Sequence, residues 1–248
     1  DKSYGGYTVG RVDRDPIFRE RVRTLLRLAD VGIADIEVKT ETIPLEQAPA
    51  YIKDVFKQLR EEQSKQENLP EDILLQRVAT VHQVFDKETK QFVAQERFDI
   101  GDESDGTQKF FHLLGPWLDT LENGYTLFVD EMDARLHPLL TRELVRMFLS
   151  PQSNPHNAQL IFTTHDAGLL RERLLRRDEV WFTEKNRFGA TELYSLADMR
   201  ERNDAPFYKN YLLGLYGAIP HLGGLRPFVE QEMQDAQNAE TERAQETA

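Results

Sequence analysis

Two predicted strands in the second half of the chain, residues 125–129 and 159–163, contain the runs Thr-Leu-Phe-Val and Leu-Ile-Phe-Thr. Both runs are apolar on both faces, which is the pattern of strands that are buried between two layers in a parallel sheet. The segment Pro138–Leu149 between them has apolar residues at helical spacing. Strand, helix and strand in this order predict an α/β fold with a mainly parallel sheet flanked by helices.

Other segments also carry the pattern of regular structure. Asp15-Pro16 is a typical helix start, because aspartate is a favoured N-cap residue and proline suits the first helical position. Residues 1–14 show no clear helix or strand pattern. We further expect a helix from Pro16 that Gly32 ends, a strand over 33–43 and a helix from about Pro44 through Leu59. Residues 78–85 and 92–100 predict a hairpin or a pair of neighbouring strands. Later in the chain we expect helices over 104–121, 167–175 and 206–213, and strands over 179–183 and 191–194.

Composition excludes several classes of protein. The 248 residues include no cysteine, so disulfide frameworks, cysteine-ligated metals and thiol nucleophiles are excluded. The net charge of -12 argues against a surface that coats nucleic acid, although a local basic groove leaves contact with DNA open. No run approaches the roughly 18 consecutive apolar residues of a membrane span. The N-terminus lacks the basic stretch and following apolar run that are typical of a signal peptide. We therefore expect a soluble, cytoplasmic protein without membrane contact.

Two adjacent carboxylates, Asp130 and Glu131, directly follow the first apolar strand. Ligands of open α/β sheets bind at the carboxyl edge of the strands, where these acids would lie. The first acid is placed to hold Mg²⁺ through water, and the second to orient and deprotonate a water for attack on a γ-phosphate. Apolar strands that end in Asp-Glu are also common as N-caps or solvated loop starts, and taken alone this ordinary interpretation explains the pair as well as the catalytic one does.

The helix predicted over 104–121 begins with Ser104-Asp105-Gly106-Thr107-Gln108. A serine hydroxyl, a glycine that exposes backbone N–H and the positive end of a helix dipole together form a place for phosphate. In isolation, an ordinary capped helix explains the same residues better.

Two further groups reach the same sheet edge. Asp133 and His137 follow the acids in the run Asp-Ala-Arg-Leu-His-Pro, and His165 follows the next strand in the run Thr-Thr-His-Asp. A lone histidine at a strand end is more often a structural hydrogen-bonding residue than a catalytic one. The combination of these features therefore carries more weight than any single one.

In this order, the features resemble the C-terminal half of an ABC-class ATPase over Gly101–Asp166. The tripeptide Leu-His-Pro and the later run Phe-Tyr-Lys-Asn-Tyr resemble RloA and abortive-infection ATPases more than membrane transporters. These ATPases are relatives of the OLD, RecF and SMC proteins. In the resemblance, residues 103–109 correspond to the signature motif, 127–131 to Walker B, 133–138 to the D-loop and His165 to the switch histidine.

The resemblance implies an ABC-type C-terminal lobe of a P-loop NTPase that binds and hydrolyses ATP with Mg²⁺. It also implies a homodimer or higher homo-oligomer in which two protomers enclose ATP, switched by binding and hydrolysis. Relatives of this type act in anti-phage defence with a separate effector protein, a nuclease or a toxin. The implied catalytic residues are Glu131 and His165, the metal ligand is Asp130, and the nucleotide contacts are Ser104, Asp105, Gly106, Thr107, Gln108, Asp133 and His137.

The sequence departs from the family pattern in two ways. Asp105 occupies the position of the first signature glycine, and Thr107 or Gln108 must serve for the signature glutamine. No Gly-x-x-x-x-Gly-Lys-Ser/Thr run, the P-loop that cradles the phosphates, occurs in these 248 residues. We expect the P-loop in an N-terminal lobe ahead of Asp1 or on another polypeptide.

Two alternatives remain open. A catalytically silent scaffold would keep the fold and an interface without turnover, and the intact Asp130-Glu131 pair argues against it. A metal-dependent nuclease would use Asp130, Glu131, Asp133 and His165 as ligands, but it leaves the Ser-Asp-Gly helix start unexplained. For the ATPase, we expect an N-terminal part of the lobe with a helical insertion over 1–100, a core with the four motifs over 101–228 and a disordered acidic tail over 229–248.

Overall fold

The computed structural model describes residues 2–48, 52–54, 57, 72–202 and 204–220. In it, helix α2 (Pro16–Leu28) begins where the sequence predicts. The Asp15 side chain caps this helix by accepting hydrogen bonds from the backbone N–H groups of Ile17 and Phe18. Such a cap satisfies donors that have no partner within the helix. The helix ends before Gly32, as expected, and its buried side chains are Phe18, Val22 and Leu26.

Helix α1 (Lys2–Arg14) forms in a stretch whose sequence shows no clear helix or strand pattern. Its three glycines lower its intrinsic helix propensity, and packing on α4 (Asp105–Asn123) compensates for them. Pro116 inside α4 has no N–H to offer the carbonyl of His112. The Thr8 hydroxyl of α1 donates to that carbonyl instead, at 2.6 Å. A contact with a distant helix thus holds α1, and no local pattern encodes it.

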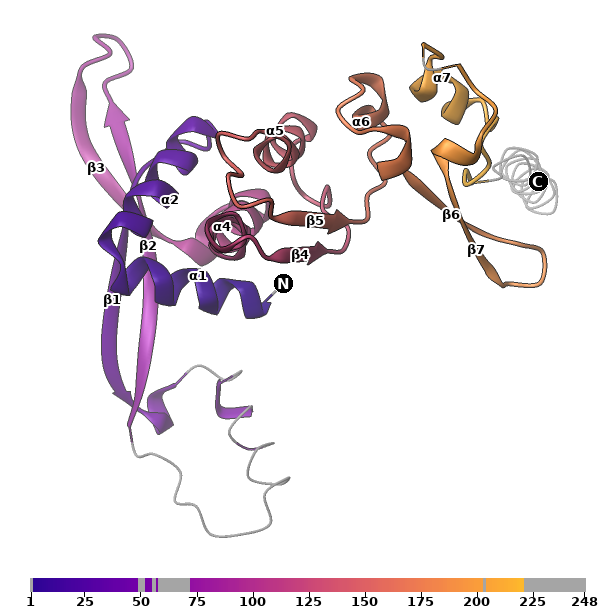
Figure 1. The fold of residues 1–248 in the computed structure, drawn as a ribbon. Helices are drawn as coiled ribbons and strands as arrows, with labels where there is room; N and C mark the ends of the chain where they lie inside the picture. Colours follow the sequence, from indigo (N-terminus) through magenta and orange to yellow (C-terminus); the bar gives the residue numbers. More distant parts are fainter. Residues whose placement is uncertain (1, 49–51, 55–56, 58–71, 203, 221–248) are drawn as a thin grey trace, which may run out of the picture. The chain divides into compact units, whose positions relative to one another are not determined.

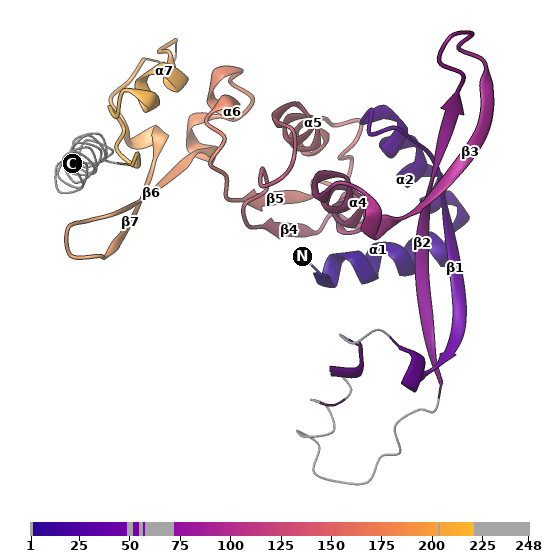
Figure 2. The same ribbon diagram turned by 180° about the vertical axis from the view of Figure 1, so that it is seen from behind.

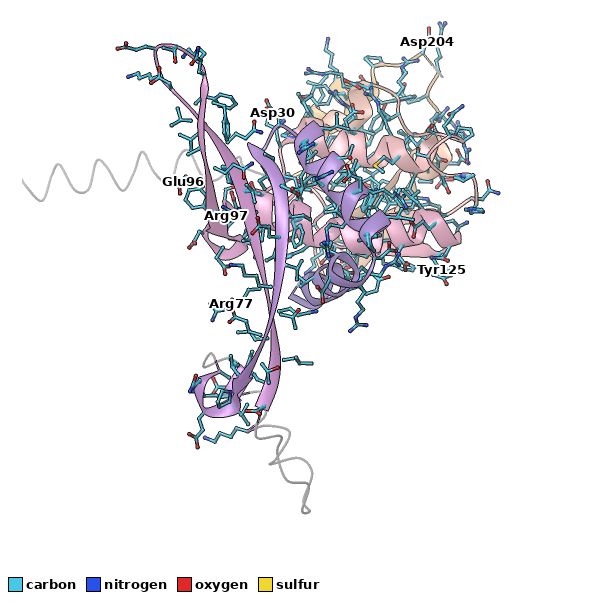
Figure 3. The ribbon with its side chains drawn as sticks, turned by 90° about the vertical axis from the view of Figure 1, so that its left-hand side faces the viewer. Asp30, Arg77, Glu96, Arg97, Tyr125 and Asp204 are labelled. Carbon is cyan, nitrogen blue, oxygen red and sulfur yellow. The ribbon has the colours of Figure 1, made fainter. Side chains whose placement is uncertain are left out.

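Strands β1 (Ile33–Pro44), β2 (Asp72–Phe85) and β3 (Phe92–Asp99) form an antiparallel sheet in the order β1-β2-β3. The predicted strand over 33–43 and the predicted hairpin are therefore confirmed. The hairpin turn is stabilised by Asp86, whose side chain accepts hydrogen bonds from two backbone N–H groups of the turn. On the face away from the helices, Arg97 of β3 forms an ion pair with Glu37 of β1 (Figure 3).

The helix predicted from Pro44 through Leu59 does not begin at Pro44. A 3-10 turn covers Leu45–Gln47 instead. Most of the remaining residues of that predicted helix lie outside the described residues.

Helices α1, α2 and α4 lie between the antiparallel sheet and a second pair of strands, β4 (Thr126–Val129) and β5 (Gln159–Phe162), in Figure 1 and from behind in Figure 2. Helix α5 (Pro138–Leu149) connects the two strands at the predicted residues. The pair is parallel, with Thr126 opposite Gln159. Helix α4 supplies the centre of the core, and its buried apolar side chains are Phe110, Phe111, Leu113, Leu114, Trp117, Leu118 and Leu121.

The expectation of a mainly parallel sheet is wrong for the described part of the chain. There, parallel pairing is confined to β4 and β5, and the other two sheets are antiparallel. The expected burial of both faces is also incorrect, because the side chains of Phe128 and Ile161 are 63% and 50% exposed. One face of the pair packs on the core through Leu127 and Val129. The opposite face is also apolar, and no described residues cover it.

The described residues from Ala167 onward form a second compact unit, separate from the unit formed by the described residues up to Asp166. Helix α6 (Gly168–Arg171) is shorter than predicted, and strands β6 (Trp181–Lys185) and β7 (Thr191–Ser195) form an antiparallel pair. Helix α7 (Phe207–Leu212) confirms the prediction over 206–213. The core of this unit consists of Phe182, Leu196, Ala205, Phe207 and Tyr216.

The acidic tail predicted over 229–248 lies outside the described residues. The three-part division expected from the sequence stays a prediction. Among the described residues, no helix combines the length and apolar character that crossing a membrane requires.

Candidate functional site

The two acids that follow β4 are organised by one residue at the end of β5. The Thr163 hydroxyl donates a hydrogen bond to Asp130 Oδ1 and accepts one from the Glu131 backbone N–H, at 2.8 Å. The backbones also stay paired beyond the strands, since Thr163 N–H donates to the Val129 carbonyl and the Met132 N–H to the Thr163 carbonyl. The predicted meeting of the two strand ends is therefore present in the structure.

Glu131 adopts a backbone conformation that is unusual for a residue with a side chain. Its φ is +46°, and such left-handed conformations cost about 1–3 kcal/mol outside glycine. Its carbonyl oxygen accepts a hydrogen bond from Lys109 Nζ at 2.8 Å. Within the described residues, the exposed Glu131 carboxylate has no hydrogen-bond or ion-pair partner. Backbone contacts thus fix the residue while its carboxylate stays accessible.

Lys109 is a site residue that the sequence interpretation missed. It lies on α4, four positions after Asp105, so both residues share one face of the helix. Burial lowers the pKa of Lys109, against the opposing effect of the nearby Asp133 and Glu131 carboxylates. The helical spacing predicts that Lys109 shares a face with Asp105, but no pattern in the sequence shows that this face lies beside the acids.

The start of α4 packs directly on the loop that follows the acids. Ser104 caps the helix, since its hydroxyl accepts from the Thr107 backbone N–H at 3.2 Å. Asp105 forms an ion pair with Arg135 at 3.4 Å, and both side chains are about two thirds exposed. A Cβ atom on Gly106 would lie 2.5 Å from the Arg135 carbonyl oxygen. A side chain at this position would therefore fit only if the loop at Arg135 shifted, which is a structural reason for glycine that the sequence does not show.

Thr107 and Gln108 are turned toward their own loop. The Thr107 hydroxyl shares a hydrogen bond of 2.9 Å with the Ser104 hydroxyl, and Thr107 is buried. Gln108 Nε2 donates to the backbone carbonyls of Gly101 and Glu103, at 3.1 and 2.7 Å. In this arrangement both side chains stabilise the helix start, and their contact with a nucleotide stays a prediction.

The remaining predicted site residues differ in their roles. His137 caps α5, because its Nδ1 accepts a hydrogen bond from the Leu139 backbone N–H at 3.2 Å. The Asp133 carboxylate accepts one from the His165 backbone N–H, also at 3.2 Å. The exposed His165 ring has no hydrogen-bond partner in the described part of the chain. The His137 ring thus stabilises the start of α5, whereas the His165 ring is accessible to a ligand.

The donor groups fit Mg²⁺ better than a metal held by protein side chains alone. Magnesium is commonly bound by one or two carboxylates together with waters and phosphate oxygens. Asp130 offers one exposed carboxylate, oriented by Thr163. In the described part of the chain, no three His, Asp or Glu side chains are arranged to hold a metal. The nuclease alternative, which needs such a group, gains no support.

Comparisons with known proteins bear on this geometry. Residues 18–171 match the family described as "AAA domain, putative AbiEii toxin, Type IV TA system". The chain belongs to this family. A search of the curated proteins finds no match. Membership of the AAA family supports a P-loop ATPase-type domain with an α/β fold, ATP binding with Mg²⁺, and ATPase activity. The matched range contains α4, the two acids and His165.

Proposed function

We propose that this AAA-family chain is the signature and Walker B lobe of an ABC-type ATPase that hydrolyses ATP as a dimerising switch. The observation that carries the proposal is the meeting of three separate segments at one place. The start of α4, the acids after β4 and the end of β5 are joined by the contacts of Gly106 with Arg135 and of Thr163 with Asp130 and Glu131.

Each group in this arrangement has a chemical task. The Glu131 carboxylate orients a water and accepts its proton, and the absence of a competing partner in the described residues suits that role. Asp130 would hold Mg²⁺, which when bound neutralises charge on the phosphates. The His165 ring would contact the γ-phosphate region and respond to its presence. Lys109 and Arg135 bring positive charge to the same loop.

The apolar face of β4 and β5 that the described residues leave uncovered supports a second part of the ATPase. Two parallel strands alone form a marginal sheet, and their apolar side chains Phe128 and Ile161 face outward. Further strands that carry the P-loop would cover this surface and supply the phosphate-binding groups that the 248 residues lack. We place these strands in an N-terminal lobe or on another polypeptide.

The biological role that we propose is anti-phage defence with a separate effector, a nuclease or a toxin, in the cytoplasm. It is supported by the resemblance to abortive-infection ATPases and by the family description, which names a toxin of a toxin–antitoxin system. ATP binding would drive association of two copies, and hydrolysis would release them. Contact with DNA stays an open part of this proposal.

Glu131→Gln in the complete ATPase tests the function. The amide can accept a hydrogen bond but cannot take a proton, so hydrolysis should fall by roughly 10²- to 10⁴-fold while ATP binding persists. The matched control is Glu96→Gln on the exposed strand β3, labelled in Figure 3, which should leave turnover unchanged. Steady-state phosphate release and equilibrium ATP binding measure the two effects. Normal turnover in Glu131→Gln would remove Glu131 from the mechanism, and absence of turnover in the unmodified ATPase would favour the silent scaffold.

A further inference from the structure

Glu131 is restrained on both sides of its α carbon by side chains from other elements. Its N–H donates to the Thr163 hydroxyl, and its carbonyl accepts from Lys109 Nζ, both at 2.8 Å. Lys109 belongs to α4 and Thr163 directly follows β5. The residue with positive φ is therefore restrained by groups that are distant in the sequence and are brought together by the fold, in addition to the local bond that its carbonyl accepts from the Ala134 backbone N–H.

Another residue with positive φ shows how an ordinary turn differs. Lys90 has a φ of +56° in the exposed hairpin turn between β2 and β3. Its N–H donates to the backbone carbonyl of Asp86 at 3.0 Å. That turn is held by groups that all lie within it. The Glu131 carbonyl also accepts a local hydrogen bond, from the Ala134 backbone N–H at 3.0 Å, but Glu131 is bound in addition by two side chains that belong to other segments. Strained backbone that is held by its surroundings is characteristic of functional sites.

The geometry points to Lys109 and Thr163 as positioning residues that clamp the backbone of Glu131 and thereby aim its carboxylate. Because Thr163 also binds Asp130, one hydroxyl orients both acids. Because Lys109 lies on α4 one turn after Asp105, the clamp joins the start of that helix to the acid. The catalytic consequence rests on the proposed ATPase function, and the conformational consequence does not.

Nuclear magnetic resonance of the full chain tests the clamp without nucleotide. The Glu131 Cα shift and the coupling between its amide and α protons report φ. In Lys109→Met the lysine donor is lost, so these signals should leave the positive-φ values or divide between two conformers. Lys109→Arg, which keeps a donor, should retain them. Lys87→Met, in the exposed hairpin turn, is the matched lysine control and should change nothing.

Thr163 is tested in the same way and independently. Thr163→Val keeps the shape but removes the hydroxyl, and Thr163→Ser restores it. Positive-φ signals of Glu131 that persist in Lys109→Met would overturn the role of Lys109, and their persistence in Thr163→Val would overturn that of Thr163. If Thr163→Val does not fold, the comparison of Lys109→Met with Lys109→Arg still decides whether a clamp exists.

Kinetics of the complete ATPase test whether the clamp serves catalysis. A misaimed base should lower kcat on the order of 10- to 100-fold and leave KM for ATP unchanged. In a Glu131→Gln background, Lys109→Met should add no further loss, because the carboxylate that it positions is already gone. An equal loss in both backgrounds would overturn positioning through Glu131. Normal turnover in Glu131→Gln alone would instead defeat the proposed function, and the resonance measurement would still judge the clamp.

Discussion

Helix α4 makes two close contacts that each depend on a glycine, and the contacts differ in almost every other respect. At Gly115, a Cβ atom would lie 2.1 Å from Oγ1 of Thr8 on α1, in the buried core. At Gly106, it would lie 2.5 Å from the Arg135 carbonyl oxygen. This second contact is at the surface, beside an exposed ion pair of Asp105 with Arg135.

The two contacts show that one part of α4 contributes to the stability of the fold and another part to the candidate site. The contact at Gly115 lets Thr8 satisfy the His112 carbonyl within a close-packed core, and unsatisfied buried groups are costly. The contact at Gly106 buries little apolar surface, and exposed ion pairs contribute little. Its value lies in placing the start of α4 beside the acids. Substitutions at Gly115 should therefore act on folding, and substitutions at Gly106 on the site.

Gly115→Ala should produce the largest loss of stability. The added methyl group would overlap Thr8, and neither helix can move without disturbing close-packed neighbours. We expect the free energy of unfolding to fall by about 3 kcal/mol, the upper part of the usual range for overpacking. Urea denaturation followed by far-ultraviolet circular dichroism measures it.

The matched control is Gly10→Ala, another glycine within a helix. No atom lies within 4 Å of a Cβ placed there. Alanine should therefore stabilise α1 by up to about 1 kcal/mol, through helix propensity alone. Equal stability of Gly115→Ala and the unmodified chain would show that α1 does not pack on α4 as described.

Gly106→Ala should cost less stability and more activity. The exposed loop at Arg135 can yield to the methyl group, so we expect a loss of roughly 1–2 kcal/mol in the free energy of unfolding. The same shift would move the start of α4 away from the acids. ATP-dependent association of the complete ATPase, followed by size-exclusion chromatography, should then weaken in protein that remains folded.

Asp105→Asn separates the ion pair from the steric contact at the same place. Exposed pairs contribute about 0–1 kcal/mol, so this variant should be nearly as stable as the unmodified chain. If Gly106→Ala showed normal ATP-dependent association, the start of α4 would not be part of the nucleotide site.

Local signals in the sequence explain which elements were predicted correctly. The Asp15-Pro16 start of α2, the hairpin around Asp86 and helix α5 each follow from residues that act within a few positions of one another. The convergence of the acids and Thr163 follows from parallel strand topology, which brings strand ends to one edge. These parts of the fold and of the site can be predicted from the sequence alone.

Long-range contacts explain the rest. The sequence of α1 has few local helix signals. The helix is held instead by the hydrogen bond from the Thr8 hydroxyl to the His112 carbonyl, 104 residues away in the sequence. That carbonyl is left without a helical partner because Pro116 has no N–H. The roles of Lys109 and of Gly106 depend on where α4 crosses the acidic loop, which no spacing within one segment encodes. The sequence does not predict the exposed face of β4 and β5, because strands that are apolar on both faces are usually buried between two layers of the same protein.

The smallest effect expected at the buried contact is a pH dependence through His112. This residue lies half-buried on α4 beside α1, where a Cβ on Gly5 would lie 3.0 Å from its ring. Burial lowers the pKa of His112 below its ordinary value of 6.5. The unfolded chain therefore takes up this proton at a higher pH than the folded chain does. Stability from His112 should be fully present above about pH 6.5 and should be lost as pH falls through the lower pKa of the folded state.

His112→Gln isolates this contribution, because glutamine does not titrate and keeps a polar side chain at the α1–α4 contact. Urea midpoints measured from pH 7.5 downward, over about two units that span the ordinary histidine pKa, should fall less steeply in the variant than in the unmodified chain. Titration of the His112 ring protons by nuclear magnetic resonance gives its folded pKa directly. Equal slopes in the two proteins would mean that the ring takes up a proton as readily in the folded chain as in water. The contact at Gly115 would then be far more open to solvent than its packing indicates, and its contrast with the exposed contact at Gly106 would weaken.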